Sequence, residues 1–235
     1  MSQSDQFVAR AYTPVGTRPV ETRAAFITRT YNHLLGAIVA FTLLELWLFS
    51  TGIAEQIASV LLSGSWLLVL GGFMVVSWIA SRVASSSESL GAQYAALAGF
   101  VVAEAIIFVP LLYMANQVAP GVITSAALVT LLGFGGLTAV AFTTRKDFSF
   151  LGGILRWAMI LALVAIVSAV LFGFSLGTWF SVAMVGVAGA AILYDTSNVL
   201  NRYPEDRYVA GALQLFASVA LMFWYVLRIF MGSRN

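Results

Sequence analysis

Three carboxylates of this sequence lie inside long apolar stretches, where charged side chains are rare. Asp195 interrupts AAILYDTSN, Glu104 lies in LAGFVVAEAIIFVPLLY, and Glu45 lies in FTLLELWLF. On insertion scales a charged side chain at the centre of a membrane costs roughly 3 kcal/mol, so such residues usually face the interior of a helix bundle and have polar partners. Carboxylates in this setting bind cations, carry protons or form ion pairs that fix helix packing.

Asp195 is the carboxylate with basic residues within reach. It lies about five residues before the end of its apolar segment, which at 1.5 Å per residue is roughly 7 to 8 Å below that end. Arg202 lies two turns further along the same face, and Arg82 ends another apolar segment at the same membrane level. This pattern is consistent with a buried ion pair that fixes helix packing and equally with a gate or cation site.

Glu104 and Glu45 have different surroundings in the sequence. A small residue recurs at every fourth position from Gly91 to Ala103, which allows another helix to approach closely. Glu104 is the next residue, so we expect it to border a helix interface, uncharged and hydrogen-bonded, because burial disfavours the charged form. Glu45 lies about one turn from the outer end of its segment, and we expect an interfacial carboxylate there.

The stretches that contain these residues are long enough to cross a membrane. The chain has 60% hydrophobic and 9% charged residues, whereas ordinary soluble domains have roughly a quarter charged. Apolar runs of membrane-spanning length recur along nearly the whole chain. The runs are at about 32–50, 64–81, 90–115, 121–142, 150–172, 178–200 and 209–231. The sequence therefore predicts an all-α integral membrane protein with seven transmembrane helices in residues 31–235.

The basic residues predict the orientation of these helices. Lys and Arg in short loops are retained on the cytoplasmic face, and an N-terminus on that face places ten of the twelve basic residues there. The ten are Arg10, Arg18, Arg23, Arg29, Arg82, Arg145, Lys146, Arg156, Arg202 and Arg207. Residues 1–30 contain prolines, arginines and no apolar run of signal-peptide length, so we expect a flexible cytoplasmic tail.

Residue types also exclude several classes of function. The chain has no cysteine and one histidine, which removes thiolate metal sites and cysteine nucleophiles. There is no Gly-x-Ser-x-Gly motif, so we expect a protein that is not an enzyme and has no cofactor. The excess of basic over acidic residues is explained by arginines in loops at an anionic membrane surface, and nothing in the sequence pattern indicates a nucleic-acid partner.

Two motifs resemble those of a known family. The stretch ILYDTSN in the sixth segment, followed by a short charged loop and a final helix ALQLFASVALMFWYVLRIF, resembles the Bax inhibitor-1 (TMBIM) family. The stretch TTRKDFSFLGG resembles more narrowly its bacterial YccA-like branch. This resemblance implies a seven-helix bundle in which the last helix is central and is surrounded by the other six. It also implies location in the bacterial inner membrane.

The resemblance implies two different activities. Members with studied transport behave as pH-sensitive calcium leaks, in which an aspartate matching Asp195 shares a proton with a second aspartate on the final helix and pairs with an arginine on the second segment. Ser218 stands at the second aspartate's position here, while Arg82 is available as the arginine. The YccA-like branch is instead associated with restraining the membrane protease FtsH, which engages the cytoplasmic tail.

Two functions therefore stay open. The first is a modulator or partner of FtsH in membrane-protein quality control, which the basic tail and the YccA-like loop favour. The alternative is a leak for Ca²⁺ or H⁺, with Asp195, Arg82, Glu104, Glu45 and Ser218 as its pathway or gate. Ca²⁺ takes six to eight oxygen ligands, so a site with so few carboxylates would bind it weakly, in a partly hydrated form suited to passage.

Overall fold

The chain folds into a bundle of long α-helices. The computed structural model describes residues 13–118, 120–144 and 146–233, and within them no β-strand forms. The elements are the 3-10 helix η1 (Val15–Thr17) and the α-helices α2 (Val20–Ser50), α3 (Ile53–Ser63), α4 (Trp66–Ser86), α5 (Leu90–Val118), α6 (Val122–Thr144), α7 (Leu151–Phe172), α8 (Gly177–Asn201) and α9 (Tyr208–Gly232). All the α-helices except α3 are long and apolar enough to cross a membrane, which gives seven in the described part of the chain. The predicted seven-helix membrane fold is confirmed.

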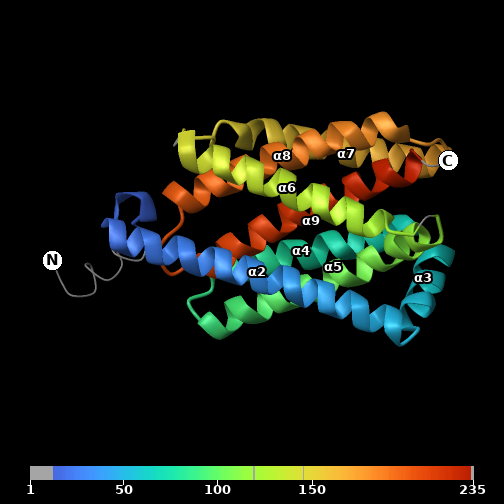
Figure 1. Ribbon diagram of the computed structural model, residues 1–235, viewed down its shortest axis with the longest axis horizontal. Helices are drawn as coiled ribbons and strands as arrows, with labels where there is room; N and C mark the ends of the chain where they lie inside the picture. Colours follow the sequence, from blue (N-terminus) through green and yellow to red (C-terminus); the bar gives the residue numbers. More distant parts are fainter. Residues whose placement is uncertain (1–12, 119, 145, 234–235) are drawn as a thin grey trace.

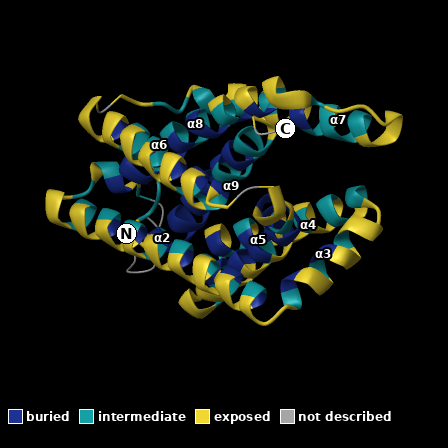
Figure 2. Cartoon of the chain, turned by 45° about the vertical axis from the view of Figure 1, so that its right-hand side comes forward, coloured by how far each residue is buried: buried dark blue, intermediate teal, exposed yellow. Residues whose placement is uncertain are grey.

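Helix α9 occupies the centre of the bundle, as Figure 1 shows. It packs against α2, α4, α5, α6 and α8. As the resemblance implied, the other six spanning helices surround it. The backbone of α7 packs against α8 and α4, and α7 reaches α9 through side chains, with Ala162 in one buried cluster with Tyr225. Figure 2 shows that buried residues gather on α9 and α5, whereas exposed residues predominate on the outer helices.

The outer surface of the bundle is apolar, as a membrane requires. Leu132, Trp78 and Trp179 are among the exposed large hydrophobic residues. Helices span a membrane because they satisfy their backbone hydrogen bonds internally, so these side chains can face lipid without exposing polar groups. Two turns rely on glycine: α2 passes into α3 at Gly52 (φ 76°), and α7 ends at Gly173 (φ 71°), a left-handed conformation that other residues rarely adopt.

The first helix and its neighbour differ from the expectation. Helix α2 begins at Val20, well before the start predicted at about 32, because the polar residues of its first turns contribute no hydropathy signal. Helix α3 was expected to be part of a loop. Its eleven residues are too short to cross a bilayer, and it packs through Ala54 and Ala58 against the ends of α2 and α5.

The segment before α2 is docked on the turn between α8 and α9. We call residues 13–18 the N-terminal strap. The Val15 amide donates a hydrogen bond to the Tyr203 carbonyl at 2.8 Å, the Val15 side chain is fully buried, and the Arg18 guanidinium lies 3.5 Å from the Glu205 carboxylate. Of the tail expected over residues 1–30, residues 1–12 lie outside the described residues, while the strap is ordered and residues 20–30 are helical.

The strap defines the two ends of the bundle. The start of α2 and the turn between α8 and α9 lie together at what we call the N-terminal end. The loop between α4 and α5 lies there too, because Arg207 donates a hydrogen bond to the Ser87 carbonyl. Helices α2, α5 and α9 finish at the opposite, C-terminal end.

Candidate functional site

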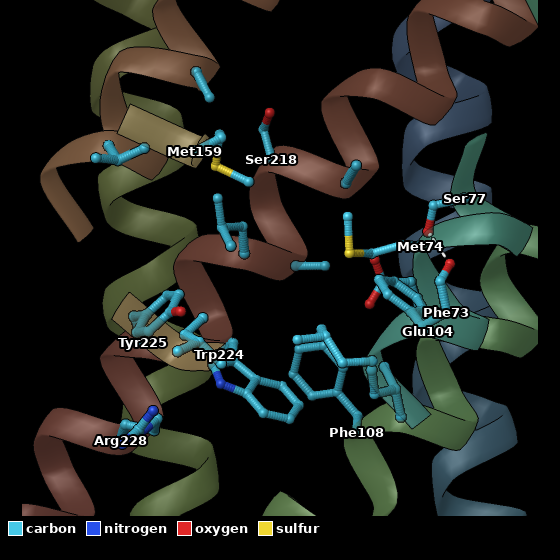
Figure 3. A pocket seen from close by; sticks show the side chains of 18 of the residues that line it. Phe73, Met74, Ser77, Glu104, Phe108, Met159, Ser218, Trp224, Tyr225 and Arg228 are labelled. Carbon is cyan, nitrogen blue, oxygen red and sulfur yellow. Dashed lines mark hydrogen bonds between the residues drawn. The ribbon is translucent and has the colours of Figure 1, made fainter. Parts of the chain in front are cut away.

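A cavity of about 770 Å³ lies between α4, α5, α7, α8 and α9. Most of its wall is apolar, and Figure 3 shows aromatic and methionine side chains pointing into it. The wall contains polar side chains from four helices and one loop: Ser77 and Ser81 from α4, Glu104 from α5, Ser175 from the loop between α7 and α8, Tyr194 and Asp195 from α8, and Gln214, Ser218, Tyr225 and Arg228 from α9. The cavity thus collects two of the three carboxylates that interrupt the apolar segments.

The spacing of residues on α9 explains why this helix supplies so much of the wall. Gln214, Ser218, Leu221, Tyr225 and Arg228 are separated alternately by four and three positions, and all five line the cavity. Residues at this spacing lie on one face of an α-helix, one above another. A single face of the central helix therefore carries polar groups along most of the length of the cavity.

Asp195 and Ser218 are direct partners. The Ser218 hydroxyl donates a hydrogen bond to Asp195 Oδ2 at 2.5 Å, and the two residues are 8% and 6% exposed. They meet because α8 and α9 are joined by a short turn and pack closely along their length. The structure brings together Asp195 and Ser218, the residue at the position where the resemblance implies a second aspartate.

Glu104 lies on the opposite wall, as Figure 3 shows. It is 6% exposed, and among the described residues no group donates a hydrogen bond to it. Between the two walls, Gln214 Nε2 donates to Ser81 Oγ at 3.2 Å and links α9 to α4. The structure places Glu104 at a helix interface, as expected, and its carboxyl group faces the space of the cavity.

Neither arginine considered as a partner of Asp195 pairs with it. Arg202 lies 3.1 Å from the carboxylate of Asp147, and Arg82 is exposed and is not part of the cavity wall. None of the ion pairs formed by the described residues includes Asp195. The prediction that an arginine at the same membrane depth pairs with Asp195 was wrong. Equal depth does not fix the direction in which a side chain points around its helix. In addition, a long arginine side chain at a helix end can reach water or lipid headgroups.

The two motifs that carry the family resemblance contact each other at the N-terminal end. The Phe148 amide of the loop between α6 and α7 donates to the Ser197 hydroxyl of α8 at 3.1 Å. In the same loop the Ser149 amide donates to Asp147 Oδ1 at 2.9 Å. This backbone hydrogen bond, followed by the contact with Arg202, lowers the pKa of Asp147 from its ordinary value. The loop is thereby fixed to Ser197, two residues after Asp195, and to Arg202.

Glu45 is separate from the cavity. It is 6% exposed, and neither of its carboxylate oxygens has a hydrogen-bond partner within the described part of the chain. The expected interfacial position is not observed, because α3 folds over this end of α2 through Leu44 and Leu48. Of the five predicted site residues, the cavity therefore unites Asp195, Ser218 and Glu104.

A second polar cluster could not be found from the sequence. His33 of α2 and the Tyr94 hydroxyl of α5 share a hydrogen bond of 2.9 Å, and the Tyr94 and Tyr208 hydroxyls lie 3.4 Å apart. The Arg29 guanidinium lies over the Tyr208 ring, 5.7 Å from its centre. These residues are far apart in the sequence and share no motif, so only the packing of α2, α5 and α9 brings them together.

Comparison with known proteins gives consistent matches. A family model described as "Inhibitor of apoptosis-promoting Bax1" matches residues 23–235. An uncharacterized protein of Pseudomonas aeruginosa is 33% identical over 69% of this chain and 72% of its own. A protein of Escherichia coli K12 named "Modulator of FtsH protease YccA" is 28% identical over 80% of this chain and 86% of its own. "Bax inhibitor 1" of Schizosaccharomyces pombe is 34% identical over 46% of this chain and 41% of its own.

Proposed function

The chain belongs to the Bax inhibitor-1 family, and from this premise we propose that it modulates the FtsH protease in the quality control of membrane proteins. The observation that carries the proposal is the similarity to the Escherichia coli modulator of FtsH, which extends over 80% of this chain and 86% of that protein. In this proposal the chain is not an enzyme. It acts as a binding partner in a bacterial inner membrane, with its N-terminus in the cytoplasm.

The N-terminal end of the bundle supplies the surface for such a partner. The strap, the turn between α8 and α9, and the Asp147 loop lie there and are fixed to one another by hydrogen bonds and ion pairs. Residues 1–12 precede the strap. A protease that takes hold of this tail would therefore find a rigid surface directly behind it.

Reconstitution with FtsH tests this proposal. FtsH and a membrane-protein substrate are placed in liposomes with the full-length chain, with a variant lacking residues 2–12, or with neither. We expect the full-length chain to co-purify with FtsH and to slow degradation of the substrate, and the variant to lose both effects. An unchanged degradation rate together with no co-purification would contradict the proposal.

Passage of cations through the cavity is the second candidate function. The observation that favours it is that Glu104, Asp195 and Ser218 line one cavity. Their oxygens are too few to complete the six to eight ligands of Ca²⁺, so an ion would keep part of its hydration shell. Weak binding of this kind suits passage better than storage.

Cation flux from liposomes containing the purified protein tests this candidate. Asp195→Asn removes the charge from the cavity, and Glu45→Gln is the matched control because it removes a buried carboxylate outside the cavity. We expect Ca²⁺ flux in the parent and in Glu45→Gln, and its loss in Asp195→Asn. Absence of flux in the parent at every pH would eliminate the leak and leave the protease proposal in place.

A further inference from the structure

Arg228 lies where two apolar cavities meet. It lines the large cavity and also a second, adjoining one of about 320 Å³. The second cavity is formed mainly by apolar residues of α3, α5 and α9. Trp66 and Trp224 line both cavities as well, and their rings are stacked with centres 6.2 Å apart. One cation and two indole rings thus connect two separate apolar spaces.

The large cavity opens sideways. Met74 of α4 and Met159 and Val170 of α7 line it and are at the same time exposed by 45%, 45% and 43%. Helices α4 and α7 therefore leave an opening between them on the outer face of the bundle. In a membrane this face contacts lipid, so a hydrocarbon chain can enter the cavity without crossing water.

Within residues 13–118, 120–144 and 146–233, no carboxylate lies close enough to Arg228 to form an ion pair. The ion pairs of the described residues are formed elsewhere, at the N-terminal end. Arg228 lies close to the C-terminal end of α9, whereas Glu104 lies deeper in the bundle by about ten residues of helix, or about 15 Å. At the level of a helix end, arginine and tryptophan are the residue types that contact lipid headgroups.

We propose that this region binds one anionic phospholipid with two acyl chains. The phosphate of the lipid contacts the guanidinium of Arg228, which offers several N–H donors in a geometry that matches phosphate oxygens. One acyl chain occupies the outer part of the large cavity, and the other occupies the smaller cavity. The stacked indoles of Trp66 and Trp224 lie between the two chains.

Native mass spectrometry of the full-length protein in detergent tests the proposal. The probes are dioleoylphosphatidylglycerol, its single-chain lyso form, and dioleoylphosphatidylcholine, which carries no net charge. We expect the parent to bind one two-chain phosphatidylglycerol about tenfold more tightly than dioleoylphosphatidylcholine, because the choline ammonium already balances the phosphate charge that Arg228 would otherwise balance. The lyso form should also bind more weakly than the two-chain lipid, because it can fill only one of the two cavities. Arg228→Gln should lose the preference for the anionic headgroup.

Two further variants test whether lipid binding depends on Arg228 in particular and on the side opening of the large cavity. Arg156→Gln removes an arginine that is exposed on α7 and lines neither cavity, so it should keep the preference. Val170→Trp fills the side opening of the large cavity and should reduce binding of the two-chain lipid more than binding of the lyso form. Equal binding of anionic and neutral lipids by the parent, or an equal loss in Arg228→Gln and Arg156→Gln, would overturn the proposal.

The lipid site is independent of the proposed function. Its readout is the mass of the bound lipid and requires neither FtsH nor ion flux. A chain that binds the lipid but leaves FtsH unaffected would support this site and contradict the protease proposal. A chain that slows FtsH but does not bind the lipid would support the protease proposal and contradict the lipid site.

Discussion

Ser218 gives Asp195 a neutral partner in a place where the family resemblance implies a second carboxyl. A hydroxyl can donate a hydrogen bond to the aspartate at any pH in the physiological range, and it adds no titratable group. The 2.5 Å contact therefore holds α8 and α9 together without a shared proton. If cations pass through the cavity, we expect their flux in the parent to vary little between about pH 6 and 8, because only histidine has an ordinary pKa in that range.

The variant Ser218→Asp should make cation flux through the cavity depend on pH. Two carboxyls at this distance cannot both ionise cheaply in a desolvated site, so one proton becomes shared between them. Flux through the variant should then depend steeply on pH between about 6 and 8, and the dependence should disappear when Asp195→Asn is added. A parent that already shows the steep dependence would point to Glu104 as the second carboxyl.

Asp147 provides a pH-dependent contact outside the spanning helices. Because its pKa is lowered in the folded chain, its contribution to stability is present above the ordinary pKa of about 4 and is lost as the pH falls through the lowered value. At neutral pH, Asp147→Ala should reduce hydrogen-exchange protection of the Ser149 amide. Asp147→Asn keeps an oxygen acceptor and should retain part of the protection. Equal protection in the parent and both variants would show that the carboxylate does not hold the loop.

At the scale of elements, the approach of α7 to α8 depends on one glycine. A Cβ atom at Gly152 would lie 2.9 Å from the nearest atom of the Tyr194 ring, whereas one at Gly153 would have no neighbour within 4 Å. We expect Gly152→Leu to force the tyrosine or the whole helix to move, at a cost of about 1 to 3 kcal/mol, and Gly153→Leu to change little. Thermal unfolding in detergent measures both. A lower Tm for Gly153→Leu than for Gly152→Leu would contradict this account.

The elements most visible in the sequence were the seven apolar segments, since the length of an apolar run is set directly by the thickness of the membrane. The beginning of α2 could not be predicted, because residues 20–30 are polar enough to resemble a tail, although they form a helix that packs Phe26 into the core. Helix α3 was missed for a related reason: its eleven residues cannot span a membrane and follow the end of α2 too closely to be separated by hydropathy.

The candidate site was only partly predictable. Depth and residue type identified Asp195 and Glu104 as residues that need polar surroundings, the family resemblance pointed to Ser218, and all three line one cavity. Depth alone also suggested Arg82 as the partner of Asp195, which the structure does not show. A sequence gives the position of a residue along its helix, but its direction toward a particular neighbour depends on how the helices are rotated against each other.

The orientation of the whole molecule in the membrane can be tested because the chain contains no cysteine. Ser63 and Ser86 are both exposed and lie at the ends of α3 and α4, respectively. With the N-terminus in the cytoplasm, Ser63→Cys in intact cells should react with a membrane-impermeant thiol reagent, and Ser86→Cys should react only after the membrane is opened. The reverse pattern would invert the topology and place the strap outside the cell.

The N-terminal strap also determines how the molecule responds to a mechanical pull. Force applied at residues 1–12 does not pass first into α2, because the chain is fixed beforehand to the turn between α8 and α9 by Val15 and Arg18. Tension therefore acts initially on the connection between the two helices that carry Asp195 and Ser218. As long as the strap stays attached, the load reaches α8 and the central helix α9 before it reaches α2.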